Sequence, residues 1–433
     1  MEAVRLSRDT WLSGFQWFFF IFCNTVVIPP TLQSAFHLTS ATTFVLTQYS
    51  FLTTALACLL QAFFGHRRAL MEGPGGLWWG TILTLTLAES AQGTPLASIG
   101  GSLALGIALA GVLTMVIGFS GLGPWLARLF RPAVMIVFMF LLGAQLTTIF
   151  FKGMLGLPFG AVNGPVDLNG AAFSLAVAVV IFIVTFIVIL PQRIGKFAVL
   201  LGTILGWGIY VCWFGNTHVI TQNQSWQWFP LGHSLDIKPG IVITAVLTGL
   251  VNISNTFGAI RGSDTFYGNS PAMPALYRRS FVVSGAMTLI GAPLGVIPFS
   301  PFVSSIGLIT QTQDATRRAF VVGSLLFLLI GLFPPLTRFF CAIPLTISSA
   351  VMLVAYLPLL WSSLLFVNLT TLNSRNIYRI AIPLFCGVFL MGVPGAYLQQ
   401  LPLLVRPLLS NGLLMGVLIA VALENLFPWD RVK

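Results

Sequence analysis

The chain is a succession of long apolar runs joined by short polar stretches, and this pattern restricts its fold more than any other feature. An apolar run of about 20 residues can cross the hydrocarbon core of a bilayer as a helix. Only 7% of the 433 residues are charged, against about 25% in a typical soluble domain. We therefore predict an all-α polytopic membrane protein. Its fourteen expected transmembrane segments are 12–30, 43–64, 77–88, 99–118, 133–151, 171–190, 197–214, 240–260, 280–297, 303–311, 319–336, 341–361, 377–396 and 407–427.

The basic residues indicate how these segments are oriented. With the N-terminus inside and strict alternation, 17 of the 21 Lys and Arg residues fall in one set of loops and ends. The opposite set holds only Lys152, Lys238, Arg338 and Arg406. Cytoplasmic loops carry such an excess of Lys and Arg. We expect both termini in the cytoplasm, and we attribute the net charge of +11 to membrane topology and not to nucleic-acid binding.

Two of the fourteen segments are short and interrupted by glycine, proline or serine. The third begins Met71-Glu72-Gly73-Pro74-Gly75-Gly76, and the tenth begins Pro298-Phe299-Ser300-Pro301-Phe302-Val303-Ser304-Ser305. They are seven segments apart, and an odd number of spans per half inverts one half relative to the other across the membrane. Weaker similarities at the same spacing of seven segments are Asn24-Thr25 with Asn255-Thr256, and Pro132 with Pro344. The sequence thus predicts a 7+7 inverted repeat with short extended stretches in segments 3 and 10.

Extended backbone at membrane depth must bond to protein, water or a ligand, because lipid offers no hydrogen-bonding partner. Two such stretches near the midplane can present N–H groups to a small polar ligand, and the helices that follow them point their positive ends at it. The pattern is typical of a transporter's binding site. The alternative for Gly73, Gly75 and Gly76 is close helix packing, a common role of glycine in membrane helices.

Polar residues inside the spans are further candidates, since a charge in lipid is costly. Glu72 is the best candidate for a pore-facing acid, and its alternative is a solvated carboxylate beside Arg67 and Arg68. Segment eight is the most polar of the long spans. Its Asn255 is expected to contact a ligand or to bond neighbouring helices instead.

Other conspicuous residues are expected to have structural roles. Trp78 and Trp79 are typical of the aromatic belt at a membrane interface, with stacking against a ring as the alternative for Trp78. Glu89 closes the third segment near the outer face. Asp264 with Arg261 is expected to be a cytoplasmic loop pair.

Several stretches taken together match a known family. They are Gln16-Trp17 with Asn24-Thr25-Val26-Val27-Ile28-Pro29, Leu129-Phe130-Arg131-Pro132-Ala133-Val134-Met135 with Leu142-Gly143, Ile253-Ser254-Asn255-Thr256-Phe257-Gly258, Ser304-Ser305-Ile306-Gly307, and Ile343-Pro344-Leu345 through Tyr356. In this set the chain resembles, over nearly its whole length, the nucleobase-ascorbate transporters, the xanthine/uracil permease family of proton-linked nucleobase symporters. The Trp78-Trp79 pair is similar to the purine permease branch.

The resemblance implies a core domain that slides against a gate domain. The core would comprise 1–125 (segments 1–4) and 240–337 (segments 8–11), and the gate 126–239 (segments 5–7) and 338–433 (segments 12–14). In relatives, substrate lies between the short stretches of segments 3 and 10. The corresponding substrate-binding residues here would be Gly75, Gly76, Asn255, Val303, Ser304 and Ser305. Of these, Gly76 and Val303 would offer backbone N–H groups, and Asn255 and Ser304 their side chains.

The departures from the family pattern concern coupling. Relatives usually have glutamate where Asn255 stands, glutamate or glutamine followed by asparagine at Ser304-Ser305, and histidine at Trp17. An amide or hydroxyl can bind a nucleobase but takes up no proton near neutral pH. We hypothesise that Glu72 replaces the missing acids as the coupling or orienting group.

The leading hypothesis is a secondary active transporter, a permease that moves nucleobases, mainly purines, by alternating access. Transport is expected to be coupled to a proton or another cation. The alternative is an anion or other small-solute carrier or channel on the same fold. We expect a homodimeric multi-pass protein of the bacterial inner (cytoplasmic) membrane, with no cofactor.

The polar residues argue against an enzyme. Catalysis at membrane depth needs a cluster of acids, histidines or a nucleophile with its base, whereas the 10 acidic and four histidine residues are expected mostly in loops. No GxxxxGK[ST] loop is present to couple ATP hydrolysis. The five cysteines lie in or beside apolar runs without CxxC spacing, so we expect neither a disulfide framework nor a metal site.

Overall fold

The computed structural model describes residues 8–159, 168–195, 197–215, 226–268, 273–357, 359–367, 370, 372–374, 376–398 and 400–429. Each of the fourteen apolar segments contains helix in these ranges, as expected where lipid leaves backbone groups to be satisfied within their own segment. Six helical stretches of the described chain are long and apolar enough to cross a membrane. The prediction of a predominantly helical membrane protein is confirmed.

The helices pack in two groups, the first of which gathers around the closely packed pair α5 and α13. Helix α11 packs on α5, and α1 and α3 pack on α15 in the same group. Its members are α1 (Arg8–Val26), α2 (Ile28–Phe36), α3 (Ser40–Phe63), β1 (Glu72–Pro74), α4 (Gly76–Ser90), α5 (Leu96–Ser120), α11 (Pro239–Gly262), α13 (Met273–Leu294), β2 (Phe299–Pro301), α14 (Ser305–Thr312) and α15 (Arg317–Leu332).

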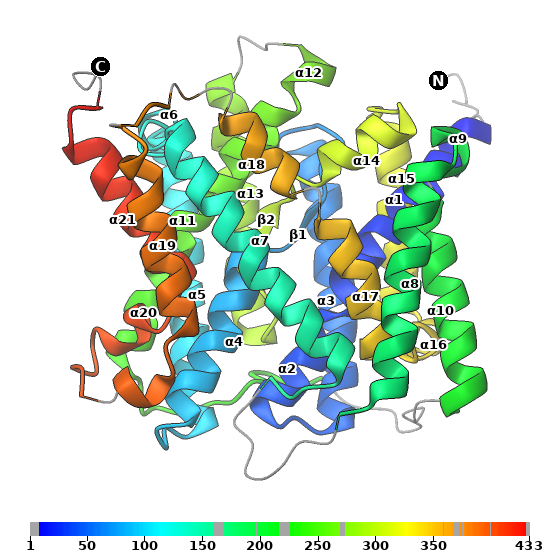
Figure 1. Ribbon diagram of the computed structural model, residues 1–433, viewed down its shortest axis with the longest axis horizontal. Coiled ribbons are helices and arrows are strands. Elements are labelled where there is room, and N and C mark those ends of the chain that lie inside the picture. The colour runs from blue at the N-terminus through cyan, green and yellow to red at the C-terminus, as the bar shows by residue number, and fades with distance from the viewer. Residues whose placement is uncertain are drawn as a thin grey trace.

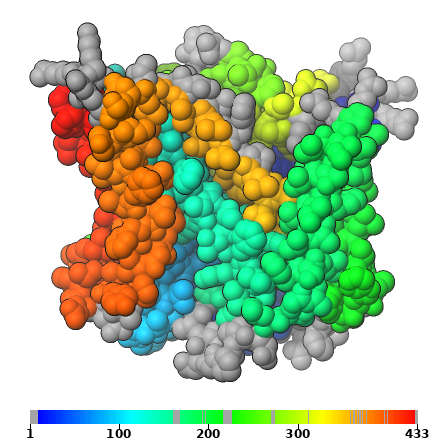
Figure 2. Space-filling model, in the orientation of Figure 1, coloured from blue at the N-terminus to red at the C-terminus, as the bar shows by residue number. Residues whose placement is uncertain are grey.

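The second group is built around α7, which packs against α17, α18, α19 and α21. Helices α8 and α10 pack on each other and on α17. Figure 2 shows this group covering one face of the molecule, with α7 between α19 and α8. Its members are α7 (Pro132–Leu155), α8 (Gly170–Ile189), α10 (Ala198–Phe214), α17 (Leu345–Tyr356), α18 (Leu359–Val367), α19 (Tyr378–Gly392) and α21 (Gly412–Leu426).

Short helices lie at the two ends of the molecule. The start of α1 and the end of α21 lie at the same end of the molecule as α6 (Gly123–Leu126), α9 (Gln192–Gly195) and α12 (Asp264–Tyr267) (Figure 1). At the opposite end lie α2, α16 (Pro334–Cys341) and α20 (Arg406–Leu409) (Figure 1). The 3-10 turn η1 spans Gly395–Leu398.

Proline divides two of the expected segments. The first run is split at Val27, two residues before the pair Pro29-Pro30, because proline lacks the N–H that an α-helix needs. The eleventh ends at Leu332, and α16 then turns away by 98° from Pro334 onward. Each break places a short helix at the end of the molecule opposite the termini.

Candidate functional site

The two interrupted segments meet near the centre of the molecule and pair as antiparallel strands (Figure 1). Two hydrogen bonds extend the pairing beyond the strands. The Gly75 N–H donates to the Pro298 carbonyl and the Phe302 N–H donates to the Met71 carbonyl, each at 2.8 Å. The expected extended stretches in segments 3 and 10 are therefore present, and each satisfies the backbone of the other.

Both strands lead into helices whose N-termini start at this crossing. Helix α4 begins at Gly76 and α14 at Ser305, and no side chain among the described residues caps either. The first N–H groups of a helix have no partner within it, and they carry the positive end of its dipole. The N–H groups of Val303 and Ser304, just before α14, also find no acceptor in the described part of the chain. The crossing therefore presents donors suited to an electron-rich ligand.

One face of α7 packs directly against this crossing. A methyl group placed at Gly76 would lie 2.9 Å from Leu146 Cδ1. One placed at Gly258 of α11 would lie 3.3 Å from both Met135 Cε and Val303 Cγ2. Residues three and four positions apart share a helix face. The face consists of the buried side chains Met135, Met139, Leu142 and Leu146, which we call the α7 stripe.

Helix α11 is tied to the strand pair by two asparagines. The Asn252 side-chain amide donates to the Phe299 carbonyl at 3.1 Å, and the Asn255 amide donates to Asn252 Oδ1 at 3.0 Å. The side-chain oxygen of Asn255 finds no hydrogen-bond partner within the described ranges. Asn255 therefore keeps an acceptor free beside the crossing.

Two of the expected contact residues have their polar groups engaged in the scaffold. The Ser305 hydroxyl accepts a hydrogen bond from the Met71 N–H at 3.0 Å. The Gly75 N–H is bonded to Pro298, and a methyl group at Gly75 would lie 2.9 Å from Ser300 Oγ. Gly75 thus permits the close approach of the two strands.

Glu72, the first residue of β1, is completely buried. Ser284 of α13 donates its hydroxyl to Glu72 Oε1 at 2.5 Å, and Gln61 of α3 donates to the Ser284 hydroxyl at 3.0 Å. The second carboxylate oxygen, Oε2, has no hydrogen-bond partner among the described residues. The alternative of a solvated carboxylate beside Arg67 and Arg68 is therefore wrong.

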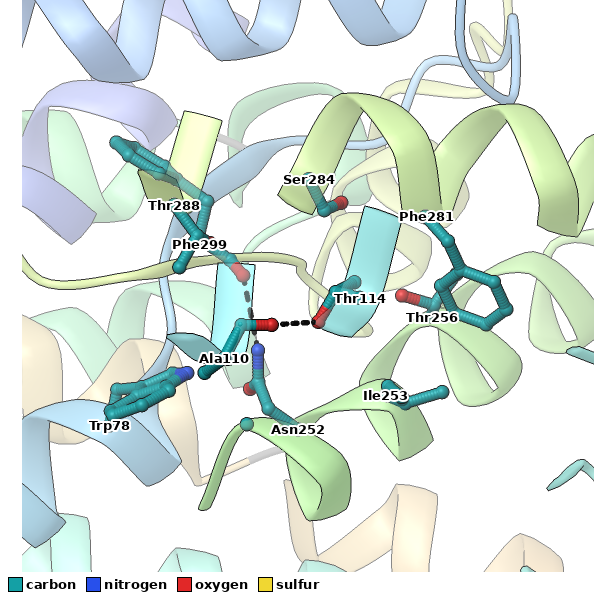
Figure 3. A pocket seen from close by; sticks show the side chains of 11 residues that line it. Trp78, Ala110, Thr114, Asn252, Ile253, Thr256, Phe281, Ser284, Thr288 and Phe299 are labelled. Carbon is teal, nitrogen blue, oxygen red and sulfur yellow. Dashed lines mark hydrogen bonds between the residues drawn. The ribbon is translucent and has the colours of Figure 1, made fainter. Parts of the chain in front are cut away.

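A small cavity with both polar and apolar lining lies between α4, α5, α11 and α13 (Figure 3). Ser284 lines the cavity, as do the hydroxyl-bearing side chains of Thr256 and Thr288. Since Ser284 also bonds Glu72, a single hydroxyl connects the cavity with the buried acid. Ser284 and Gln61 were not predicted from the sequence, although a polar residue within an apolar span is itself a functional signal.

The two tryptophans of segment 3 lie in the interior. Trp78 and Trp79 are each 1% exposed. Trp78 lines the cavity, and the Trp79 indole N–H donates to the Thr31 hydroxyl at 2.9 Å. Their expected role in an interface belt is therefore wrong, because the short third segment places them beside the strand pair.

Arg68 anchors the chain where it enters β1. Its guanidinium donates to Asp264 Oδ1 at 2.7 Å and to the Ile260 carbonyl at 2.6 Å. The expected loop pair of Asp264 with Arg261 is thus replaced by a buried pair with Arg68. Burial and the neighbouring Arg68 lower the pKa of His66 to about 3, so this imidazole is neutral at physiological pH.

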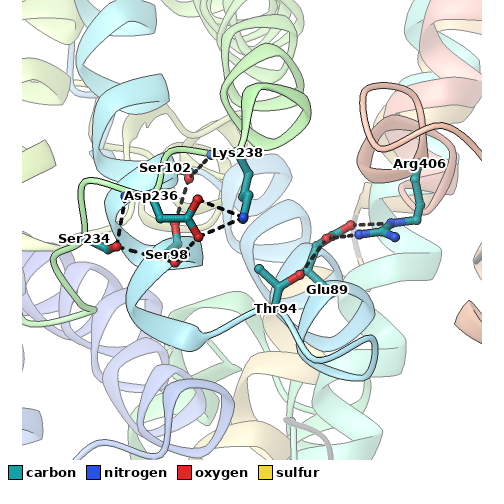
Figure 4. Close-up of polar contacts among 8 residues, drawn as sticks. All are labelled: Glu89, Thr94, Ser98, Ser102, Ser234, Asp236, Lys238 and Arg406. Atoms are coloured by element: carbon teal, nitrogen blue, oxygen red, sulfur yellow. Dashed lines mark hydrogen bonds and ion pairs between the residues drawn. The ribbon is translucent and has the colours of Figure 1, made fainter.

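A second buried carboxylate lies at the other end of segment 3, at the end of the molecule opposite the termini. Glu89 accepts from Arg406 at both oxygens, at 3.0 Å from Nε to Oε1 and 2.5 Å from Nη2 to Oε2 (Figure 4). The Thr94 hydroxyl also donates to Glu89, at 3.2 Å. Figure 4 shows the exposed pair Asp236–Lys238 in the same region.

Paired discontinuous segments whose helix ends converge inside a helical membrane protein define the class of secondary transporters. The fold agrees with that of the murine Solute Carrier 26 family member A9 anion transporter, determined in the inward-facing state. That structure aligns at a TM-score of 0.62 and 13% identity, covering 98% of this chain and 69% of the other.

The chain belongs to the xanthine/uracil permease family, because the family model described as "Permease family" matches residues 8–396. Among curated proteins, it is 28% identical to the putative purine permease YwdJ of Bacillus subtilis (strain 168), over 98% of this chain and 97% of YwdJ. It is 24% identical to the nucleobase transporter PlUacP of Paenibacillus larvae, over 97% of this chain and 95% of PlUacP. The resemblance seen in the sequence is confirmed. The protein is a transporter and not an enzyme, and these relatives do not favour the anion-carrier alternative.

Proposed function

We propose that this chain carries nucleobases, with purines as its main substrates, by alternating access across the bacterial inner membrane. Relatives named as purine and nucleobase transporters align with nearly the whole chain. A purine has several acceptor atoms on a planar ring, and it suits a site with N–H donors on one side and an apolar wall on the other. The observation that best supports this proposal is the β1–β2 crossing, whose unpaired donors lie next to the α7 stripe.

The site residues have distinct proposed roles. Gly76 and Val303 donate backbone N–H groups to the base, and Asn255 and Ser304 contact it through their side chains. Gly75 and Ser305 keep the crossing closely packed and correctly placed. Apart from Asn255, Ser304 and Ser305, whose side chains take part, these roles depend on backbone geometry and glycine size. They suit a region where side-chain acids are scarce.

The proposed topology has fourteen spans arranged as a 7+7 inverted repeat, with both termini in the cytoplasm. The antiparallel pairing of β1 with β2 supports the repeat. So do Pro132, the first residue of α7, and Pro344, the residue directly before α17. The short helices α6, α9 and α12 lie in loops that are expected to be cytoplasmic. Their location at the same end as the start of α1 and the end of α21 supports the cytoplasmic orientation of that end (Figure 1). Five expected cytoplasmic basic residues lie outside the described residues: Arg5, Lys196, Arg375, Arg431 and Lys433. We retain a homodimer as part of the proposal.

The two helix groups correspond to a core domain, 1–125 with 240–337, and a gate domain, 126–239 with 338–433. Packing is dense within each group and sparse between α1, α4 or α11 on one side and α7, α17 or α21 on the other. A sparse boundary supports relative movement of two bodies. The substrate site lies at this boundary, between the strand crossing and α7.

Glu72 is the proposed coupling residue, with a proton or another cation as its ligand. Its unpartnered oxygen and the absence of a basic partner within the described residues make a bare negative charge costly there. A cation that neutralises the carboxylate removes this cost. Ser284 and the adjoining cavity give the group a polar connection to the core interior.

The test is uptake of radiolabelled adenine, guanine, hypoxanthine, xanthine, uracil and urate by cells that lack their own nucleobase permeases. We expect accumulation of at least one purine. We also expect Gly76→Ala to lower uptake by about tenfold or more, because small misplacements at a binding site have large effects. Uptake no higher than in cells without the protein would contradict the proposal.

The matched control is Gly143→Ala on α7. A methyl group there would meet nothing within 4 Å, whereas at Gly76 it would press on Leu146. Uptake should therefore survive the change at Gly143. Equal losses in both variants would mean that the space beside Gly76 is not part of the substrate site.

A further inference from the structure

The C-terminal part of the chain is attached to α4 at two separate points. The first is the bidentate Glu89–Arg406 ion pair, with Arg406 as the first residue of α20. The second is a 2.7 Å hydrogen bond from the Asn411 amide to the Thr81 hydroxyl, between two completely buried side chains. Asn411 also caps α21 by accepting from the Leu414 N–H at 3.1 Å. The start of α21 is therefore fixed to α4.

The Asn411–Thr81 bond joins the two helix groups, and Arg406 lies on the short helix α20, which packs on α11 and α4 of the first group and on α21 of the second. Helix α4 belongs to the group around α5 and α13, and α21 belongs to the group around α7. Other buried ion pairs of the described chain lie within one group, such as Arg68–Asp264 and Arg379–Glu424. The Glu89–Arg406 pair instead ties α4 to the short helix that leads into α21, where the two groups meet.

The energetics of a buried ion pair suit a contact that must break and re-form. Desolvation of two charges largely offsets their attraction, so the net stabilisation is small, whereas loss of one partner leaves a costly buried charge. When the boundary opens, water reaches both groups and replaces their mutual bonds. Bidentate geometry meanwhile gives the closed arrangement a defined position.

We propose that Glu89 and Arg406 are positioning residues that hold the end of the transport path opposite the termini closed. This inference rests on the alternating-access function proposed above. In the open state α20 and the start of α21 move away from α4, and the Asn411–Thr81 bond breaks with the ion pair. With both termini cytoplasmic, this end is the extracellular one.

The experiment measures how fast a thiol at position 81 reacts with a maleimide in purified protein. A Thr81→Cys reporter is made in a variant whose five native cysteines are replaced by alanine, and every comparison is made within this background. We expect Arg406→Gln to raise the labelling rate by about tenfold, a usual size for a conformational coupling. The exchanged pair Glu89→Arg with Arg406→Glu should return the rate toward that of the unsubstituted pair.

Lys238→Gln is the matched control, since it removes the exposed Asp236–Lys238 pair at the same end of the molecule. Its labelling rate should not change. An unchanged rate in Arg406→Gln, or an equal rise in Lys238→Gln, would overturn the proposal. The proposal is also overturned if the protein with the exchanged pair is labelled as fast as Arg406→Gln, because these two side chains would then contribute to packing and not through their ion pair.

Thiol labelling needs no substrate, so the result stands whether or not nucleobases are transported. Failure of uptake with the expected labelling pattern would reject the nucleobase proposal and keep the closure by Glu89 and Arg406. Nucleobase uptake without the expected labelling pattern would keep the nucleobase proposal and reject the closure by Glu89 and Arg406.

Discussion

The two buried carboxylates of segment 3 have opposite surroundings. Glu89, in the last turn of α4, has a bidentate arginine and a threonine hydroxyl. Glu72, at the start of β1, has one serine hydroxyl, and its other oxygen has no partner among the described residues. The first carboxylate is satisfied by the protein, and the second is not.

This difference separates a structural acid from a functional one. A carboxylate with its own arginine stays charged without help from a ligand. A carboxylate that lacks a counter-ion in a low-dielectric interior favours binding of a cation or a proton. Burial alone would have ranked the two equally, since both are almost inaccessible to solvent.

The largest effect is expected from bridging the Glu89 end of the segment. With Thr81→Cys and Asn411→Cys in a variant without native cysteines, oxidation or a short bifunctional thiol reagent should stop uptake almost completely. The two native side chains are hydrogen-bonded at 2.7 Å, so a bridge would hold α4 against α21. Reduction of the disulfide should restore transport, and each single variant serves as control. Full uptake by the bridged protein would show that this boundary does not open.

A smaller but more specific effect is expected at Glu72. Glu72→Gln should lower gradient-driven accumulation by about tenfold or more, as expected when the charge that carries the coupling is lost. Uptake should also become independent of pH. Initial rates measured between pH 5 and pH 8 provide the test. The same change at the other carboxylate, Glu89→Gln, should slow uptake but keep its pH dependence, and a flat profile in both variants would remove the distinction.

The smallest effect concerns stability, and here the change at Glu89 is expected to cost more than the change at Glu72. Glu89→Gln leaves Arg406 incompletely paired, which costs about 1–3 kcal/mol for a buried polar group. Glu72→Gln removes a charge that has no counter-ion, so the loss should be below about 1 kcal/mol. Thermal unfolding of the two purified variants measures the difference. A lower Tm for Glu72→Gln than for Glu89→Gln would show that Glu72 has a stabilising partner after all.

Much of the fold was predictable because lipid imposes simple rules. Runs of apolar residues marked the helices, and the glycines and prolines of segments 3 and 10 marked the two stretches that leave the helix. Glu72 could be picked out as a charge at membrane depth. The breaks before Pro29 and Pro334 had a visible cause in the sequence, but an apolar run does not show that the chain turns by 98°.

Partners that are distant in the chain could not be predicted. Glu89 and Arg406 are 317 positions apart, and Arg406 looked like any outer loop residue. Ser284 stands in an apolar run, and its bond to Glu72 depends on how α13 lies against the strand pair. Gly75 and Ser305 matched the family's binding stretch, yet hydrogen-bonding groups of both are engaged in the scaffold.

The α7 stripe has one further physical consequence. Methionine and leucine side chains are flexible and apolar, and methionine in particular adapts to irregular neighbours. A surface of this kind makes no directional bonds, so a neighbouring body can shift along it without leaving a donor or acceptor unsatisfied. We therefore expect little resistance to relative movement along Met135, Met139, Leu142 and Leu146. Most of the resistance is expected at polar contacts between the two helix groups, such as Thr81 with Asn411.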